Sequence, residues 1–380
     1  MGSVVCTLVA FAAVVLTTAQ AQVNFTQAWS DVPFQTFPGG EYKSSSAMTF
    51  PGSTSMSAAL FKLVAGGVRD AHWHNVDEWA YVINGTCRAT VLEQGKLRGV
   101  DTWDYFEGDI WFFPANTAHT VVALADGCYF LTGYNNASFT EERDAFGLSD
   151  WLALTPQRIM AQALGLNTSA VPANLSSRTS HDGFLTRLAA PPANSLDAYR
   201  ASTLLQPPQQ AAQVHRFPLA HGNAPEVNNG GGYINLADSS TFPAATTMMG
   251  ALVKFEAGGL RQLHWHTTLS EWQFIINGTF EGAVFTRAGV AQDFTLGPGD
   301  AGFAPRGSAH WLRNTGDTDA YMILMFDGGV FTNEDVGGLI GVLPASIVAS
   351  SLNVTQGFVA SINPRLESMV PMASGNLKQA

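Results

Sequence analysis

Gly66-Gly67-Val68-Arg69-Asp70-Ala71-His72-Trp73-His74 is the most informative segment of the chain, because it occurs a second time as Gly258-Gly259-Leu260-Arg261-Gln262-Leu263-His264-Trp265-His266. Side chains alternate between the two faces of an extended strand, so both histidines of each His-Trp-His point to one face. A glutamate follows each copy (Glu78, Glu271), and a further histidine lies beyond a proline (His119, His310). Six of the nine histidines fall in these two sets, which predicts two metal sites of three imidazoles and one carboxylate.

The spacing between histidine and glutamate differs by one residue between the copies, since Glu78 follows His74 by four and Glu271 follows His266 by five. This difference reverses the strand parity, so we expect a loop or bulge there, in both copies. Asn84-Gly85 and Asn277-Gly278 then lie between apolar runs, a pattern typical of a hairpin turn. The sequence predicts that each glutamate begins a strand that leads into a tight turn.

The duplication extends well beyond the histidines, because residues 50–134 match residues 242–326, as in Phe50-Pro51 and Phe242-Pro243 at an offset of 192. The apolar segments after His74 are short, β-branched and aromatic, which favours an antiparallel sandwich or barrel. Helices are expected at 148–154, 156–164 and 344–352. The predicted fold class is all-β with peripheral helices.

The spacing of the two copies resembles the cupin superfamily. The matching residues are Gly66, His72, His74, Glu78, Gly85, Gly108, Pro114 and His119 in the first copy, where Asn116 replaces the usual glycine, and Gly258, His264, His266, Glu271, Gly278, Gly299, Pro305, Gly307 and His310 in the second. Arg-x-x-His-Trp-His with a following Glu-Trp is similar to the secreted bicupin oxalate decarboxylases. The resemblance implies a bicupin, that is, two cupin-type double-stranded β-helix (jelly-roll) barrels.

The resemblance also implies the cofactor and the substrate. The eight ligands are His72, His74, Glu78 and His119, and His264, His266, Glu271 and His310. Ligand type alone admits Mn, Fe, Co, Ni, Cu or Zn, and the family likeness favours manganese, two per chain. In the family, the arginine at the position of Arg69 and Arg261 holds oxalate, although strand parity alone places both on the face opposite the histidines.

A glutamate in a lid after the first barrel moves the proton in the family, and Glu141 stands at its position, with Glu142 beside it as the alternative. The neighbouring family residues Asn and Ser are absent here. In the second barrel the family has an acid in the strand after His310, where this chain has Leu324. Asn333 stands at the counterpart of Glu141, followed by Glu334 as a possible substitute. The sequence therefore predicts that the first site carries the reaction and that the second metal is structural or an electron reservoir.

Three functions remain open at this stage. The first is a secreted manganese-dependent oxalate decarboxylase that forms formate and CO2 with catalytic dioxygen. The second is an oxalate oxidase, which forms CO2 and hydrogen peroxide at the same kind of site. The third is a noncatalytic extracellular metal-binding cupin. Spacing alone also leaves another small-acid or flavonol dioxygenase open.

Composition and terminal segments bear on location and partners. The chain has 380 residues, of which 13% are charged, and a net charge of −11, which argues against nucleic acid as a partner. Residues 1–21 lack Asp, Glu, Lys and Arg and end in Ala19-Gln20-Ala21, which predicts a cleaved signal peptide and secretion. No later stretch is long and apolar enough to span a membrane. Oxalate, dioxygen and a homo-oligomer are the expected partners.

The predicted domains are 1–21 (signal peptide), 22–165 (first cupin domain), 166–230 (crossover of little regular structure), 231–355 (second cupin domain) and 356–380 (a frayed tail). Beyond the signal only Cys87 and Cys128 remain, as a disulfide or as two buried thiols. Seven Asn-x-Ser/Thr sequons are candidates for glycosylation: Asn24, Asn84, Asn136, Asn167, Asn174, Asn277 and Asn353.

Overall fold

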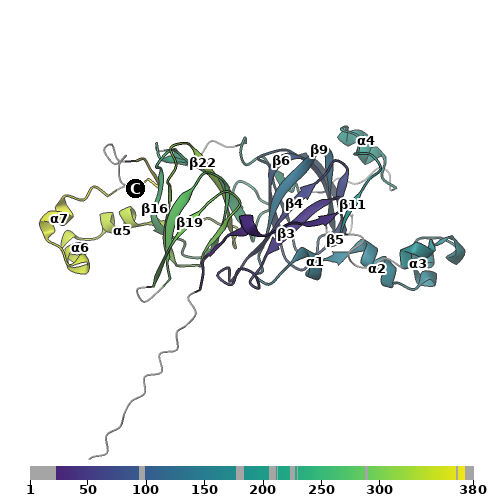
Figure 1. Cartoon of the computed structure of the whole chain (residues 1–380), viewed down its shortest axis with the longest axis horizontal. Coiled ribbons are helices and arrows are strands. Elements are labelled where there is room, and N and C mark those ends of the chain that lie inside the picture. The colour runs from purple at the N-terminus through teal and green to yellow at the C-terminus, as the bar shows by residue number, and fades with distance from the viewer. Residues whose placement is uncertain are drawn as a thin grey trace, which may run out of the picture.

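The structure is a computed structural model that describes residues 23–93, 99–176, 184–204, 211, 213–222, 227–228, 230–286, 290–364 and 367–372. It contains two β-barrels side by side, and helices project from both ends of the long axis (Figure 1). The predicted fold class, all-β with peripheral helices and two jelly-roll barrels, is confirmed. The predicted signal peptide, residues 1–21, lies outside the described residues.

The first barrel is one antiparallel sheet of 11 strands. These are β2 (Gln35–Phe37), β3 (Gly40–Ser45), β4 (Ser57–Leu63), β5 (Gly67–Trp73), β6 (Glu78–Leu92), β7 (Val100–Tyr105), β8 (Ile110–Phe113), β9 (His119–Tyr134), β10 (Phe146–Gly147), β11 (Leu185–Arg187) and β12 (Arg216–Phe217). The prediction of a loop between His74 and Glu78 is correct, since β5 ends before it and β6 begins after it.

The prediction of a hairpin at Asn84-Gly85 is wrong, because β6 runs through this dipeptide without turning back. The pairing of β6 with β9 shifts register on both sides of it. Gly85 has a φ of 79°, and Gly127, which precedes its strand partner Cys128, has a φ of 76°. A Cβ on Gly85 would lie 2.3 Å from the Gly127 carbonyl oxygen, so only glycine permits this approach. The dipeptide therefore bends the strand around the barrel instead of reversing the chain.

A disulfide joins Cys87 to Cys128 next to this bend, with Cα atoms 5.5 Å apart. The structure thus decides between the two alternatives that the sequence leaves open.

The second barrel consists of a seven-stranded and a six-stranded sheet. Its strands are β1 (Thr26–Gln27), β13 (Val227–Asn228), β14 (Gly232–Ala237), β15 (Met249–Phe255), β16 (Leu260–Trp265), β17 (Glu271–Asn277), β18 (Phe280–Phe285), β19 (Ala291–Leu296), β20 (Ala301–Ala304), β21 (Ala309–Asn314), β22 (Ala320–Phe326), β23 (Glu334–Asp335) and β24 (Met369–Val370). The hairpin predicted at Asn277-Gly278 is also wrong, since β17 pairs with β20 and β22 whereas β18 pairs with β19 and β21. Here the dipeptide carries the chain from one sheet to the other.

The helices are α1 (Glu141–Asp144), α2 (Leu148–Leu154), α3 (Gln157–Ala163), α4 (Leu196–Ala201), α5 (Val336–Val342), α6 (Ala345–Leu352) and α7 (Gln356–Ala360), with 3₁₀ turns at Trp29–Asp31, Thr168–Ala170 and Ala173–Ser176. The three predicted helices are present as α2, α3 and α6. The latter two begin one residue later than predicted, because Pro156 and Pro344 serve as N-caps.

Segments outside the predicted repeats also join the barrels. The N-terminal segment contributes β1 to the second barrel and β2 to the first. The crossover supplies β11 beside β5 and β12 beside β8, and the tail supplies β24 beside β16. Where the structure describes it, the crossover contains only such short elements, in line with the expectation of little regular structure, whereas the tail, expected to be frayed, contains β24. Open strand edges present unpaired backbone groups, and these short segments cover them.

A continuous apolar core joins the two barrels, and it includes Trp79 and Leu131 from the first and Met325 from the second. A Cβ on Gly133 would lie 2.4 Å from the Met325 sulfur, and one on Gly250 would lie 2.3 Å from the Trp79 ring. Two glycines thus let large side chains of one barrel lie against the backbone of the other. This packing holds the barrels as one unit.

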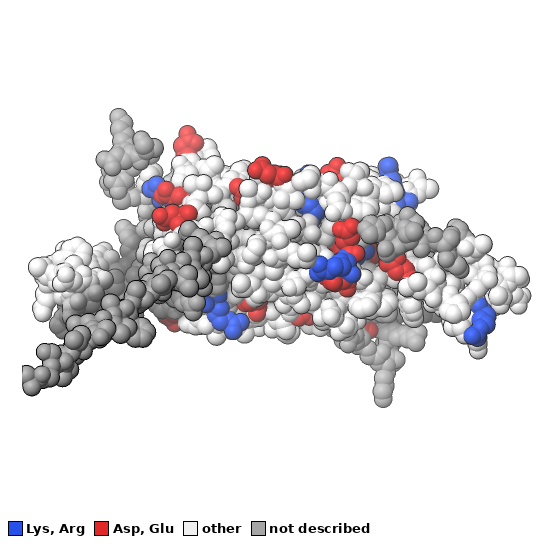
Figure 2. Space-filling model, turned by 60° about the horizontal axis from the view of Figure 1, so that its bottom comes forward, with Lys and Arg blue, Asp and Glu red and all other residues white. Residues whose placement is uncertain are grey.

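The surface carries few charges. On the face shown in Figure 2, Lys and Arg are scattered among Asp and Glu instead of forming one basic patch. Of the helices in the part of the chain that the structure describes, none is both long and apolar enough to cross a membrane.

Candidate metal centres

Each barrel encloses one group of metal-ligating side chains. His72, His74, Glu78 and His119 form the first group, and His264, His266, Glu271 and His310 form the second. All eight residues are buried, and within each group the ligand atoms lie within 4.8 Å of one another. The structure therefore brings together the residues that the sequence predicts as ligands. In both barrels the first histidine lies near the end of a strand (β5, β16) and the second follows that strand directly. The glutamate begins the next strand (β6, β17), and the third histidine lies in the strand after the proline (β9, β21).

The histidine rings are held with one nitrogen turned into each group. Every Nδ1 lies 2.6 to 2.9 Å from a backbone carbonyl oxygen. A carbonyl oxygen only accepts, so Nδ1 carries the hydrogen and Nε2 keeps its lone pair. The Nε2 atoms of His72, His119, His264 and His310 are buried and have no hydrogen-bond partner among the described residues. Buried lone pairs that converge on a carboxylate suit a divalent transition metal.

The protonation states also suit a metal. Burial, reinforced by Arg69, lowers the pKa of His72 to about 3. Burial likewise lowers the pKa of His264 well below its usual range, with Arg261 adding to the effect. Burial alone would raise the pKa of Glu78, but the neighbouring His119 and His74 lower it to about 2. At neutral pH His72 and His264 are therefore neutral and Glu78 is ionised, which are the forms that bind metal.

The ligand glutamates are oriented by different donors in the two barrels. Trp111 Nε1 donates to Glu78 Oε1 at 2.7 Å, and Gln273 Nε2 donates to Glu271 Oε1 at 2.7 Å. Trp111 pairs across the strands with Ala80, whereas Gln273 pairs with Gly302. The donor thus lies in β8 in the first barrel and in β17 in the second. In each case the residue paired with it is small, alanine or glycine, and leaves room for the large side chain. Sequence reasoning missed both donors, although comparing the copies position by position would have found them.

Arg69 faces the metal group in spite of strand parity. The pairing of β5 with β9 is irregular between Arg69 and His72, and this bulge turns the arginine to the same side as the histidine. The same irregularity separates Arg261 from His264. Both arginines are buried, each 4% exposed. Strand parity, which assumes a regular strand, therefore predicts the wrong face of the strand for Arg69 and for Arg261.

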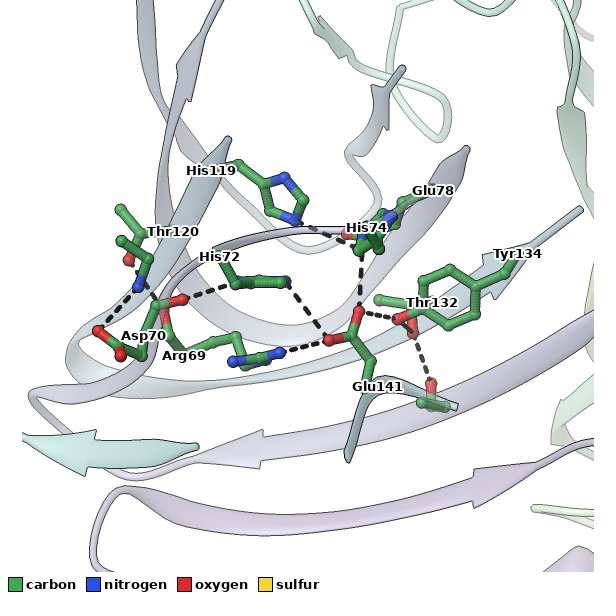
Figure 3. A network of polar contacts seen from close by, with 12 residues as sticks. Arg69, Asp70, His72, His74, Glu78, His119, Thr120, Thr132, Tyr134 and Glu141 are labelled. Atoms are coloured by element: carbon green, nitrogen blue, oxygen red, sulfur yellow. Dashed lines mark hydrogen bonds and ion pairs between the residues drawn. The ribbon is translucent and has the colours of Figure 1, made fainter. Parts of the chain in front are cut away.

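Glu141 lies at the centre of the polar network shown in Figure 3, where Arg69, His72 and Tyr134 all point toward its carboxylate. Its Oε2 is 2.5 Å from Arg69 Nη2 and 3.4 Å from His72 Nε2. Burial alone would raise the pKa of Glu141, but the Arg69 guanidinium holds it well below its usual range. Glu142, the alternative acid, is partly exposed and accepts a long 3.4 Å hydrogen bond from Gln35.

The second barrel presents a different set of groups above its metal ligands. Arg261 donates to Asn333 and, at 3.1 Å, to Asp335 Oδ1. Asn333 in turn donates to Asp335 at 3.0 Å. Glu334, which the sequence left as a possible substitute for the lid acid, is exposed, and Leu324 is buried. Asp335 was missed because its counterpart in the first copy is Arg143, a cation.

Comparisons with known proteins agree with this geometry. The family model "Cupin" matches residues 33–171 and 220–359. Oxalate decarboxylase OxdC of Bacillus subtilis is 28% identical over 335 residues, which cover 88% of this chain and 83% of that protein. A probable oxalate decarboxylase of Arthroderma benhamiae is 28% identical over 337 residues, 87% of this chain and 79% of the relative.

Solved structures give the same result. A structure of the Bacillus subtilis oxalate decarboxylase matches with a TM-score of 0.82 at 27% identity and covers 92% of this chain and 88% of that one. A second structure of that enzyme, from work on its Mn(II) centres, matches with a TM-score of 0.82 at 26% identity, over 93% and 90% of the two chains. Both barrels and the region of the lid therefore fall within the similarity.

Proposed function

The chain belongs to the cupin family, as a bicupin of the oxalate decarboxylase type with two His3Glu groups. From this premise we propose that it is a secreted, manganese-dependent oxalate decarboxylase, which forms formate and CO2 with catalytic dioxygen. The observation that carries the proposal is the buried contact of Arg69 with Glu141 beside the ligands of the first barrel. A fixed cation for a carboxylate and a carboxyl group for a proton lie there side by side.

The eight ligand residues would hold two manganese ions, one per barrel. Bound manganese supplies a Lewis acid and a redox centre for oxalate and dioxygen. Arg69 binds the remote carboxylate of oxalate through its planar, permanently charged guanidinium. Once oxalate occupies Arg69, the guanidinium that keeps Glu141 ionised is engaged by the substrate, so Glu141 can accept and deliver the proton. Because Arg69 and Glu141 are 4% and 2% exposed, water is kept away from the reacting carbon.

The overall reaction balances without any net oxidant. The carbon–carbon bond of oxalate breaks, and one half leaves as CO2. A proton passes from Glu141 to the carbon of the other half, which becomes formate, and Glu141 regains a proton from solvent. Oxalate and one proton thus give formate and CO2, and dioxygen is returned unchanged.

Oxalate oxidase is the second candidate, because the same ligands and Arg69 serve it when no proton reaches the carbon. Oxalate, dioxygen and two protons then give two CO2 and hydrogen peroxide. The position of Glu141 over the ligands favours the decarboxylase. A noncatalytic metal-binding cupin is less well supported, since both ligand sets are complete and buried.

One assay separates these three functions. The purified protein is loaded with Mn(II) and incubated with oxalate in air, and formate and hydrogen peroxide are measured in the same sample. We expect formate as the main product with little peroxide. Mainly peroxide would make the protein an oxidase, and turnover of neither kind with a full complement of metal would make it a noncatalytic cupin.

Secretion and oligomerisation form part of the proposal. Residues 1–21 support secretion, and N-terminal sequencing of protein from the culture medium of an expressing host should show a start at about residue 22. The projecting helices support a homo-oligomer, because Trp151, Leu154, Val342 and Phe358 are 53% to 86% exposed. Light scattering should give a mass of more than one chain, and a monomer at micromolar concentration would contradict it.

A further inference from the structure

A buried hydroxyl pair, Tyr134 and Thr132, contacts the lid acid of the first barrel. The Tyr134 hydroxyl lies 2.8 Å from Glu141 Oε1 and 2.8 Å from Thr132 Oγ1. The three side chains come from the end of β9 and the start of α1, and Figure 3 shows Tyr134 on the side of Glu141 opposite Arg69. Each of the three residues is at most 2% exposed. Glu141 is therefore held by a cation on one oxygen and by a phenol on the other.

A phenol suits this position because it can both donate and accept. The Tyr134 hydroxyl donates to Glu141 Oε1, and its oxygen can accept from Thr132 Oγ1, which also lies 3.3 Å from the Ala59 carbonyl oxygen. The Tyr134 hydroxyl is thus held from both sides, and with it the Glu141 oxygen that it contacts.

The second barrel supplies an internal comparison. At the same offset of 192 residues, Phe326 replaces Tyr134, Leu324 replaces Thr132, and Asn333 replaces Glu141. The metal ligands and the arginine are retained there, so the two hydroxyls are absent only where the lid acid is absent. The hydroxyl pair therefore accompanies the acid and not the metal.

The ring of Tyr134 has a packing role that phenylalanine also fulfils. It lies edge-on to His74, with ring centres 5.7 Å apart, and against Phe139 of the lid segment at 4.6 Å. In the second barrel Phe326 makes the same edge-on contact with His266 at 5.1 Å and packs against Phe331 at 5.7 Å. Removing the hydroxyl alone is therefore compatible with the packing of this site.

We propose that Tyr134, supported by Thr132, is a positioning residue that holds the Glu141 carboxylate against Arg69 and His72 in the first barrel. This inference deepens the proposed function and rests on it for its effect on products. With Glu141 in place, the carbon left after CO2 departs receives a proton and becomes formate. With Glu141 displaced, both halves of oxalate leave as CO2 and oxalate gives up two electrons in all, while dioxygen takes these two electrons and two protons from solvent to become hydrogen peroxide.

The test compares Tyr134→Phe with Thr132→Val and with a control, Tyr129→Phe. Tyr129 lies in the same strand but contacts Lys62 outside the site. In manganese-loaded protein, Tyr134→Phe should lower the ratio of formate to peroxide about tenfold, the factor for one buried hydrogen bond to a charged group, with unchanged metal content. Thr132→Val should lower the ratio less, and Tyr129→Phe should leave it unchanged. An unchanged ratio in Tyr134→Phe, under conditions in which Glu141→Gln collapses it, overturns the proposal.

A crystal structure of the metal-loaded Tyr134→Phe protein judges the positioning without turnover. Glu141 should leave the position beside Arg69 and His72 that it keeps in the Tyr129→Phe control. If Glu141 occupies the same position in both variants, Tyr134 does not position it, and the inference fails. This structural test remains valid even if the protein does not convert oxalate. In that case only the proposed function is contradicted.

Discussion

Arg69 and Glu141 lie 72 residues apart in the chain, yet Arg69 Nη2 is 2.5 Å from Glu141 Oε2 at the first metal group. Both side chains are buried, so the guanidinium has the lid carboxylate in place of water. A substrate carboxylate that binds Arg69 must share or replace this contact. Glu141 and a substrate carboxylate therefore compete for one cation.

Replacing Glu141 by Gln should lower the rate of formate production by about 100-fold or more, because the proton carrier is lost, whereas peroxide persists. Glu142→Gln is the matched comparison, since Glu142 is adjacent but partly exposed. Its rate should stay within about threefold of wild type, as expected for a surface position. Formate and peroxide are measured together. If Glu141→Gln keeps its formate rate, the lid acid lies elsewhere.

The two arginines should respond differently to replacement by lysine. Lysine keeps the charge but lacks the forked donor geometry, so Arg69→Lys should lower kcat/KM for oxalate on the order of 10- to 100-fold. Arg261 is already engaged by Asn333 and Asp335, so Arg261→Lys should lower it far less. Steady-state kinetics on both variants decides. Equal losses would show that both barrels turn over substrate.

Metal content should follow the ligand sets one barrel at a time. His72→Ala and His264→Ala should each lose about one of two manganese ions, because three remaining ligands bind a labile divalent ion weakly. His221→Ala serves as the control, since this histidine is exposed and outside both groups. Elemental analysis after dialysis gives the stoichiometry. Loss of both ions in either variant would show that the sites are not independent.

The metal-free protein should lose stability as the pH falls below about 6.5. The pKa of His72 is about 3 in the folded protein against 6.5 in the unfolded chain. Between these two values the unfolded chain binds a proton at His72 that the folded protein does not bind. The contribution of His72 to the free energy of unfolding is therefore complete above pH 6.5 and is lost as the pH falls toward 3. Glu78, lowered from 4.5 to about 2, has the same sign at lower pH.

Urea unfolding of the metal-free protein between pH 7.5 and 4 measures this effect. His72→Asn should flatten the slope of unfolding free energy against pH in the range from 6.5 downward, since one titrating group is removed. His74 acts in the opposite direction: burial would lower its pKa, but Glu78 raises it above its usual value. A wild-type slope that His72→Asn leaves unaltered would contradict the assignment to His72.

Much of this protein could be predicted from its sequence because metal ligation and duplication are local patterns. The identity of the eight ligands, the duplication, the all-β class and three helices depend on spacing and composition within short windows. Burial then requires His72 and His74, two residues apart at the end of one strand, to face the same interior. Such features follow from backbone geometry and do not depend on which distant segment lies opposite.

The tertiary structure alone decided the features that depend on distant partners. Gly85 bends a strand instead of ending it, because β6 continues along β9 and the Gly127 carbonyl comes too close for any side chain. Arg69 reaches the metal group because a bulge against β9 breaks the parity of its own strand. Tyr134 lies on Glu141 because the lid folds back over the end of β9. In each case, contacts between segments remote in the sequence override the local pattern, and side-chain direction is set by those contacts.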